Sequence, residues 1–367
     1  MNFKFSQDQE MMRDSAKRLL ADLSTYAAVH KILDSDATHD ANLWKQMAEA
    51  GWLSTAIPEE YGGAGMGYLE LAVLAEEMGK ALACTPFASS IYFAAELIKA
   101  AGSESQKTTY LPKLAMGESI ATVAYAEKGR IDAAGVQVKA QGGKLTGTKS
   151  PVADGLCADL VIVSARDDQG VSLYLVDLNA GGVSREPVAT MDRTRKQARL
   201  TFNGASGELL GQAGQGGALI DEVSYKVAAL LAFEQVGGAQ NALEMATQYA
   251  KARYAFRRPI GSFQAIQHRI AEMFVKVEMA RSSAYYAAWA LESAPEKLHQ
   301  AASAARVMGI DAYSFAAQEN VQIHGGIGFT WEANPHLHMK RAKHLESLLG
   351  GGIVWRERLM RSMEAAA

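Results

Sequence analysis

The spacing of apolar residues changes twice along this 367-residue chain, and these changes restrict the folds open to it. Up to residue 117 apolar residues recur at helical intervals, as in Phe5–Leu23, where Ser6 is the expected N-cap. Residues 118–211 alternate instead, as in Val171–Val176, which follows the turn segment Asp167–Gly170. Long helical patterns return from residue 212. We therefore predict an α+β multidomain fold with a helical domain (1–117), a β-domain (118–211) and a helical bundle (212–367).

The bulk properties exclude several classes of protein. A net charge of −3 gives no electrostatic basis for binding nucleic acid. The N-terminus is polar, and no apolar run reaches the roughly 18 residues that a membrane span needs. Cys84 and Cys157 show neither paired nor metal-ligand spacing. We expect a cytoplasmic protein that binds neither nucleic acid nor membrane.

Two segments near the C-terminus carry the most specific motifs. The first runs from Arg253 through Phe256-Arg-Arg-Pro259-Ile-Gly-Ser-Phe263-Gln264 to Met273, and the second is Gln322-Ile-His-Gly-Gly-Ile-Gly-Phe329. Together with Trp52–Gly63, they resemble the signatures of the acyl-CoA dehydrogenase family. The order of helical, β and helical regions is also that of this family, whose C-terminal domain is a four-helix bundle. One departure is Arg257, where the family pattern has glycine.

This resemblance implies a cofactor, a substrate and partners. The family binds FAD, oxidises an acyl-CoA thioester between its α and β carbons, and passes electrons to an electron-transfer flavoprotein. It implies a homotetramer, or an α2β2 heterotetramer with a paralogous chain. The matching Arg in the family contacts the pyrophosphate of an FAD held mainly by a neighbouring subunit, and glycines let the backbone approach the ligand. The residues implied to bind FAD are Arg253, Phe256, Ile260, Phe263, Gln264, Gln322, Gly325 and Gly326.

The catalytic base is not found at either position that the family uses. One position aligns with Leu349-Gly350-Gly351 and the other with Val227, and none of these residues is acidic. Glu234 lies on the same helix face as Val227, in an apolar setting that would raise its pKa. We predict that Glu234 is the base; the alternative is a structural glutamate paired with a buried arginine. The adjacent Gly237, Gly238 and Ala239 suggest room for a bulky acyl group.

The β-domain departs further from the family pattern. Where the family has Thr-Glu-Pro followed by Gly-Ser-Asp, this chain has Ala126-Glu-Lys-Gly-Arg-Ile131. Where the family has Gly-x-Lys-x-Trp-Ile-Ser/Thr, it has Gly147-Thr-Lys-Ser-Pro-Val-Ala153. These losses leave a second reading open, in which the chain is a non-catalytic or half-site partner subunit of a heteromeric enzyme, resembling the pairs of bacterial steroid and dicarboxylate pathways. A third reading is an oxygenase-like or hydratase-like relative on the same fold.

A histidine-rich segment follows the second motif. Alternate positions of a helix do not face each other, so we expect no metal site there. We expect the segment to be a solvated surface or to meet an anionic ligand. It contains His336, His338, Lys340, Arg341, Lys343 and His344.

Overall fold

The computed structural model describes residues 6–366. Its backbone contacts divide the chain into two compact units. The first contains the residues up to 29, residues 68–83 and those from 228 onward; the second contains residues 30–67 and 84–227. Our predicted domain boundaries at residues 117 and 211 remain a prediction. No helix in the described range combines the length and apolarity needed to cross a membrane.

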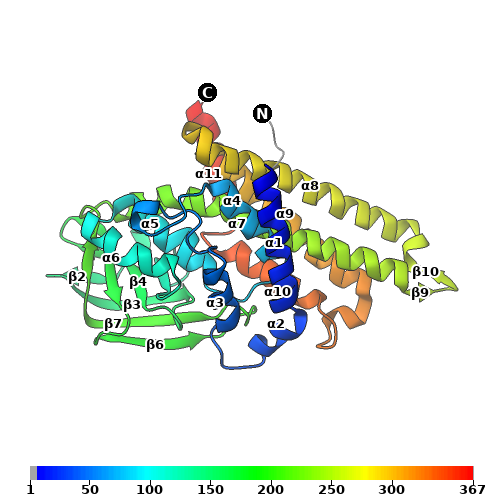
Figure 1. Cartoon of the computed structure of the whole chain (residues 1–367), viewed down its shortest axis with the longest axis horizontal. Coiled ribbons are helices and arrows are strands. Elements are labelled where there is room, and N and C mark those ends of the chain that lie inside the picture. The colour runs from blue at the N-terminus through cyan, green and yellow to red at the C-terminus, as the bar shows by residue number, and fades with distance from the viewer. Residues whose placement is uncertain (1–5, 367) are drawn as a thin grey trace. The chain divides into compact units, whose positions relative to one another are not determined.

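The first unit is built from helices (Figure 1). As predicted, Ser6 caps the first helix, and its side chain and that of Gln9 form a reciprocal capping box. Helices α8 and α9 pack along one another. Two shorter helices complete the chain: α10, which contains the histidine-rich segment that we treated as helical, and α11, which we did not predict. The helices that lie wholly or partly in this unit are α1 (Gln7–Leu23), α2 (Tyr26–Leu33), α4 (Tyr68–Lys80), α7 (Gly216–Ala252), α8 (Gln264–Ser293), α9 (Leu298–His324), α10 (Pro335–Ser347) and α11 (Gly352–Ala366).

Helices α4 and α7 approach each other closely because glycine occupies the contact positions. A Cβ on Gly79 would lie 2.0 Å from the carbonyl oxygen of Glu234, and one on Gly237 would lie 1.8 Å from that of Glu76. A Cβ on Gly238 would meet the ring of Tyr313 at 2.3 Å. The expectation that Gly237 and Gly238 leave room for a bulky acyl group is therefore wrong: neighbouring helices fill that space.

A short hairpin joins α7 to α8 and was not predicted. Its strands are β9 (Tyr254–Ala255) and β10 (Arg258–Pro259), which pair antiparallel. The two turn residues, Phe256 and Arg257, both adopt left-handed backbone conformations, with φ of 53° and 65°. The hairpin projects beyond the ends of α7 and α8 (Figure 1). Side chains at such φ values are strained, so glycine or asparagine is the usual residue in this type of turn.

The second unit contains a sheet with helices before it in sequence. The sheet order is β6-β7-β3-β2-β4-β5-β8, and β1 pairs with β4 in parallel. The predicted turn is confirmed: Asp167 pairs with Gly170, so two residues join β4 to β5. The α-helices, π-helical segment and strands that lie wholly in the second unit are α3 (Ala41–Glu49), a π-helical segment (Ala88–Ala94), α5 (Ala95–Ala101), α6 (Glu104–Ala115), β1 (Ala121–Ala124), β2 (Lys139–Gln141), β3 (Lys144–Ala153), β4 (Leu160–Asp167), β5 (Gly170–Asp177), β6 (Val183–Val188), β7 (Gln197–Ser206) and β8 (Glu208–Leu210).

Candidate cofactor-binding surface

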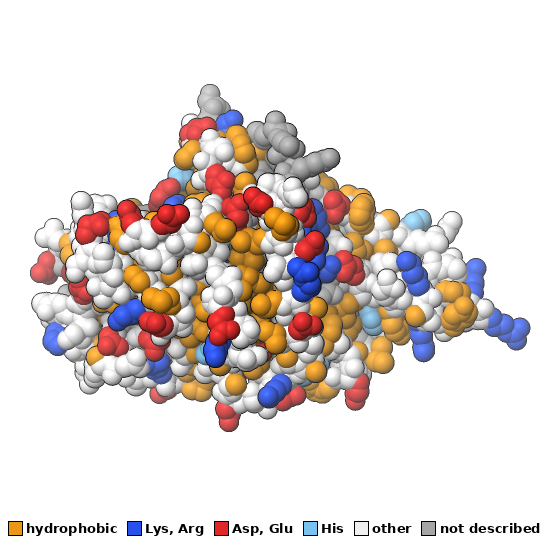
Figure 2. All heavy atoms as spheres, viewed as in Figure 1, with side chains coloured by type: hydrophobic (Ala, Val, Ile, Leu, Met, Phe, Trp, Pro, Cys, Tyr) orange, Lys and Arg blue, Asp and Glu red, His pale blue; other side chains and the backbone are white. Residues whose placement is uncertain are grey.

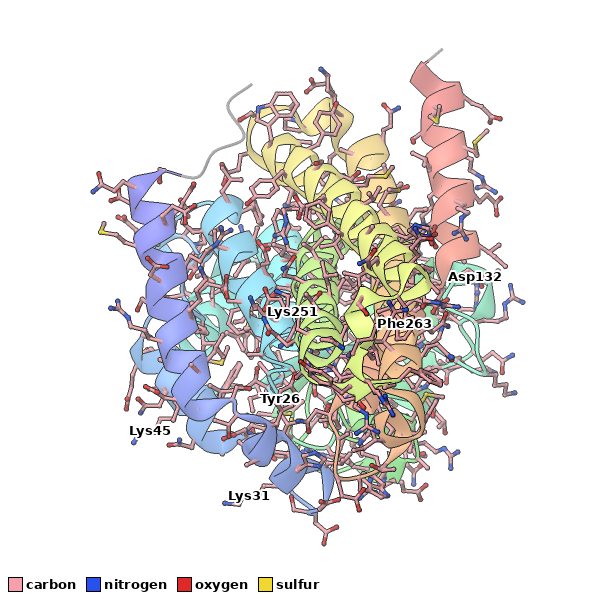
Figure 3. All side chains as sticks on the ribbon, turned by 90° about the vertical axis from the view of Figure 1, so that its right-hand side faces the viewer. Tyr26, Lys31, Lys45, Asp132, Lys251 and Phe263 are labelled. Carbon is pink, nitrogen blue, oxygen red and sulfur yellow. The ribbon has the colours of Figure 1, made fainter. Side chains whose placement is uncertain are left out.

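The hairpin and the start of α8 form an exposed surface. Phe256 is 89% exposed at the hairpin tip. The guanidinium carbon of Arg258 lies 4.0 Å from the ring centroid of Phe263, which anchors the hairpin to the beginning of α8. The amide of Ile260 donates to the carbonyl oxygen of Arg253 at 2.8 Å, which closes the loop. Figure 3 labels Lys251 near the end of α7 and Phe263 just before α8, the two ends of this connection.

The end of α9 presents bare backbone. Gln322 is exposed, and the 3-10 helix η6 (Gly325–Phe329) follows directly. Gly325 has φ of 67°, a conformation that other residues rarely adopt. A Cβ on Gly325 or Gly326 would meet no atom within 4 Å, so both glycines face open space. A ligand can therefore approach the backbone closely at these two positions.

An aromatic stack joins these two segments. The rings of Tyr249, on α7, and His324, at the end of α9, lie 4.0 Å apart between centroids and are inclined by 25°. The sequence segments that carry the family motifs are therefore brought side by side by one contact. His324 lies within the second quoted motif and Tyr249 lies four residues before the first, yet we predicted no role for either. Their only sequence signal is that each is an aromatic ring a short distance before a predicted ligand-contacting residue.

The chemistry of this surface is basic and apolar. Four cationic side chains lie in or next to the hairpin: Lys251, Arg253, Arg257 and Arg258. Exposed apolar side chains in the same unit include Tyr254, Phe256, Phe274, Val275, Met279, Ile327, Phe329 and Trp331. In Figure 2 blue and orange side chains gather where Figure 1 labels β9 and β10. The guanidinium of arginine can donate two parallel hydrogen bonds to a phosphate. Exposed apolar side chains are typical of a surface that binds a partner or ligand.

Glu234 lies away from this exposed surface, within the bundle. Its side chain is 1% exposed, and its Oε1 is 3.7 Å from Nη1 of Arg341, itself 1% exposed. Arg341 also donates to the carbonyl oxygens of Ala83 and Leu82, at 3.3 and 3.5 Å. This contact is the one expected for our alternative, a structural carboxylate paired with a buried arginine. The assignment of Glu234 as base remains a prediction.

The histidine-rich segment forms α10, and the expectation of a solvated surface is wrong for three of its six named residues. His336, His338 and Arg341 are buried, because α10 packs against α9. The His338 ring lies between two phenols: its Nε2 is 3.0 Å from the Tyr26 hydroxyl, and its Nδ1 is 3.0 Å from that of Tyr313. Burial, with a contribution from Arg341, lowers the pKa of His338 to about 3. The imidazole is therefore neutral in the folded protein.

The altered segments of the β-domain meet in a buried ion pair. Nζ of Lys149 donates to Oε1 of Glu127 at 2.6 Å and to Oγ of Ser164 at 2.8 Å. Burial lowers the pKa of Lys149 to about 8, although its bond to Glu127 opposes this shift. Glu127 also accepts from the amides of Gln137 and Val138. The pair holds the loop of residues 126–137 to β3 and β4.

The fold is helical, then β, then helical, with an exposed basic and apolar surface at the hairpin, and comparisons with known proteins specify its family. The model of the acyl-CoA dehydrogenase N-terminal domain matches residues 6–118, and that of the C-terminal domain matches residues 214–364. The chain belongs to the acyl-CoA dehydrogenase family and is an oxidoreductase of that class. The family resemblance and the fold class predicted from sequence are both confirmed.

Several relatives match over nearly the whole chain. The acyl-CoA dehydrogenase IpdE2 of Mycobacterium tuberculosis is 33% identical over 94% of this chain and 93% of its own length. A solved variant of the Tcur3481–Tcur3483 steroid ACAD is 30% identical with a TM-score of 0.89, covering 98% of this chain and 99% of that one. The ChsE4–ChsE5 complex from Mycobacterium tuberculosis is 28% identical with a TM-score of 0.89, covering 99% of each chain.

Proposed function

We propose that this chain takes part in FAD-dependent α,β-dehydrogenation of an acyl-CoA thioester, with electrons passed on to an electron-transfer flavoprotein. The observation that carries the proposal is the stack of Tyr249 on His324. It brings the segment that contains Arg253 and the hairpin next to Gly325 and Gly326, whose backbone is open to a ligand. Cationic side chains and open backbone beside one another suit the phosphates and adenosine of a dinucleotide.

The residues of the surface fit FAD. Arg253 would bind the pyrophosphate through charge and fork geometry, and Gly325 and Gly326 would let the ligand meet the backbone. The exposed ring of Phe256 offers an apolar contact. The remaining side chains that we assign to this ligand are Ile260, Phe263, Gln264 and Gln322. When bound, FAD would be the oxidant and would accept the hydride from the substrate's β carbon. A carboxylate would have to remove the proton from the α carbon.

A second candidate function is favoured by the pairing of Glu234 with Arg341. The Glu234 carboxylate is 1% exposed and lies 3.7 Å from a buried guanidinium, so a structural ion pair accounts for it without a catalytic role. Neither Val227 nor Leu349-Gly350-Gly351 supplies another acid. In this reading the chain completes the FAD site of a paralogous subunit in an α2β2 heterotetramer, and the paralogue holds the base. The paired names of two structural relatives support this assembly.

The visible spectrum separates the two candidates. The chain is purified alone, and also after co-expression with any paralogous chain that a neighbouring gene encodes. Each sample is then mixed without oxygen with straight-chain and steroid side-chain acyl-CoA thioesters. A flavin band in the chain alone that bleaches with one thioester supports the self-sufficient dehydrogenase. A colourless chain whose co-expressed complex is yellow and bleaches supports the partner subunit. If no form binds flavin, both candidates are wrong.

A further inference from the structure

The hydrogen bond of His324 determines which of its ring nitrogens carries a proton. Nδ1 lies 2.8 Å from the backbone carbonyl oxygen of Asn320. A carbonyl oxygen only accepts hydrogen bonds, so Nδ1 must be the donor. Burial lowers the pKa of His324, which favours the neutral ring. In a neutral imidazole with the proton on Nδ1, Nε2 carries a lone pair and is an acceptor.

The surroundings leave this acceptor available. Tyr249 stacks on one face of the ring and fixes its plane, since the centroids are 4.0 Å apart. Within residues 6–366 the only side-chain hydrogen bond of His324 is the one from Nδ1. The next residues, Gly325 and Gly326, bring no side chain that could approach the ring. An acceptor of fixed orientation therefore stands beside the open backbone.

We propose that His324 is a positioning residue whose Nε2 accepts a hydrogen bond from the adenosine end of FAD. This inference rests on the proposed function, because it concerns the same surface. Adenosine offers three donors that could meet such an acceptor: the 6-amino group of adenine and the 2′- and 3′-hydroxyls of ribose. Tyr249 acts through His324 by holding the ring in place. The bond fixes the nucleotide while Arg253 meets its phosphates.

Two substitutions separate the hydrogen bond from the stack. His324→Phe keeps an aromatic ring against Tyr249 and removes both ring nitrogens. His324→Gln places an amide near the Nε2 position, where its oxygen can accept. We expect FAD to bind His324→Phe about 5- to 10-fold more weakly than wild type, the effect of one hydrogen bond. We expect His324→Gln to recover most of this loss. Affinity is measured by quenching of flavin fluorescence, in the assembly that binds FAD, and thermal melting checks that each variant is folded.

Analogues of FAD test the inference on the unaltered protein as well. Three analogues each lack one donor: the 6-amino group, the 2′-hydroxyl or the 3′-hydroxyl. Wild type should bind one of them 5- to 10-fold more weakly than FAD, and His324→Phe should bind that analogue as well as it binds FAD. The inference is overturned if wild type binds all three like FAD, if His324→Phe binds FAD like wild type, or if Gln and Phe weaken binding equally. If wild type binds no FAD in any assembly, the proposed function fails instead.

Discussion

The carboxylate of Glu234 lies 3.7 Å from the guanidinium of Arg341, and both side chains are almost completely buried. Because the partners are on α7 and α10, this pair ties two helices of the first unit together. Removing one partner of a buried pair leaves the other charge without compensation. The pair therefore supports two separate predictions, one on stability and one on chemistry.

Glu234→Gln should lower the free energy of unfolding by about 3 kcal/mol, because Arg341 keeps its charge in a buried site. The double variant Glu234→Gln/Arg341→Met should recover part of this loss, since it removes both charges. Urea denaturation measures the change. Glu10→Gln is the control: Glu10 is half exposed in its pair with Arg13, and the change should stay within about 0.5 kcal/mol. A Glu234→Gln variant as stable as wild type would contradict the role of the pair.

Arg341→Met tests whether Glu234 acts as the base independently of its ion pair, with the rate of flavin reduction by the thioester as the readout. If Glu234 removes the α-proton, the flavin of Arg341→Met should still be reduced, because this variant keeps the carboxylate. The rate of flavin reduction in Glu234→Gln should then fall about 10²-fold or more. If the base is on a paralogous subunit, both variants should be reduced at rates close to that of wild type once folded. Stopped-flow absorbance of the flavin band measures these rates. Equal, severe loss in both variants would favour neither reading.

Gly237→Ala should destabilise the protein by about 3 kcal/mol, at the upper end for an overpacked core. The added Cβ would lie 1.8 Å from the carbonyl oxygen of Glu76, so α4 and α7 would have to move apart. Gly181→Ala is the matched control, because a Cβ there meets nothing within 4 Å. Thermal or urea unfolding compares the two. The close helix contact is refuted if both substitutions have the same small effect.

His338 should make the protein sensitive to acid. Its pKa is about 3 in the folded state, against an ordinary value of 6.5. Between these values the unfolded chain binds a proton that the folded chain does not, so stability falls as the pH drops below 6.5. The groups around the ring are the hydroxyls of Tyr26 and Tyr313 and the guanidinium of Arg341.

Replacing His338 by Gln should therefore flatten the dependence of unfolding free energy on pH, by up to about 1.4 kcal/mol per pH unit between pH 6 and 4. Wild type, His338→Gln and the exposed-site control His268→Gln are unfolded in urea across this range. The control should follow wild type. An unchanged slope in His338→Gln would show that other groups govern acid sensitivity.

Arg253 should matter for cofactor affinity and not for stability. Arg253→Ala should weaken FAD binding about tenfold or more, and Arg253→Lys should retain part of it, since lysine keeps the charge and loses the fork. Retention of flavin during dialysis measures the effect. Arg199→Ala removes another exposed arginine, paired with Glu186 on the sheet, and should leave affinity unchanged. Equal retention in all four proteins would exclude Arg253 from the site.

Local signals predicted the parts of the fold whose causes are local. The capping box needs only the four residues from Ser6 to Gln9, and the turn needs only the four from Asp167 to Gly170. We did not predict the hairpin at Phe256 and Arg257, because such turns are predicted from glycine or asparagine at the left-handed positions. Here bulky residues occupy both positions. The contact of Arg258 with Phe263, at the start of α8, stabilises the hairpin in spite of this preference.

Residue types and their spacing along the chain were enough to predict the family, the order of helical and β regions, and the motif residues of the candidate surface. The three-dimensional structure was needed to show that Glu234 meets Arg341, that His338 is buried between two tyrosines, and that Tyr249 stacks on His324. Each of these contacts joins residues far apart in sequence. Helical periodicity identifies the faces of one helix, but the burial and charge of a side chain depend on which other helix covers that face.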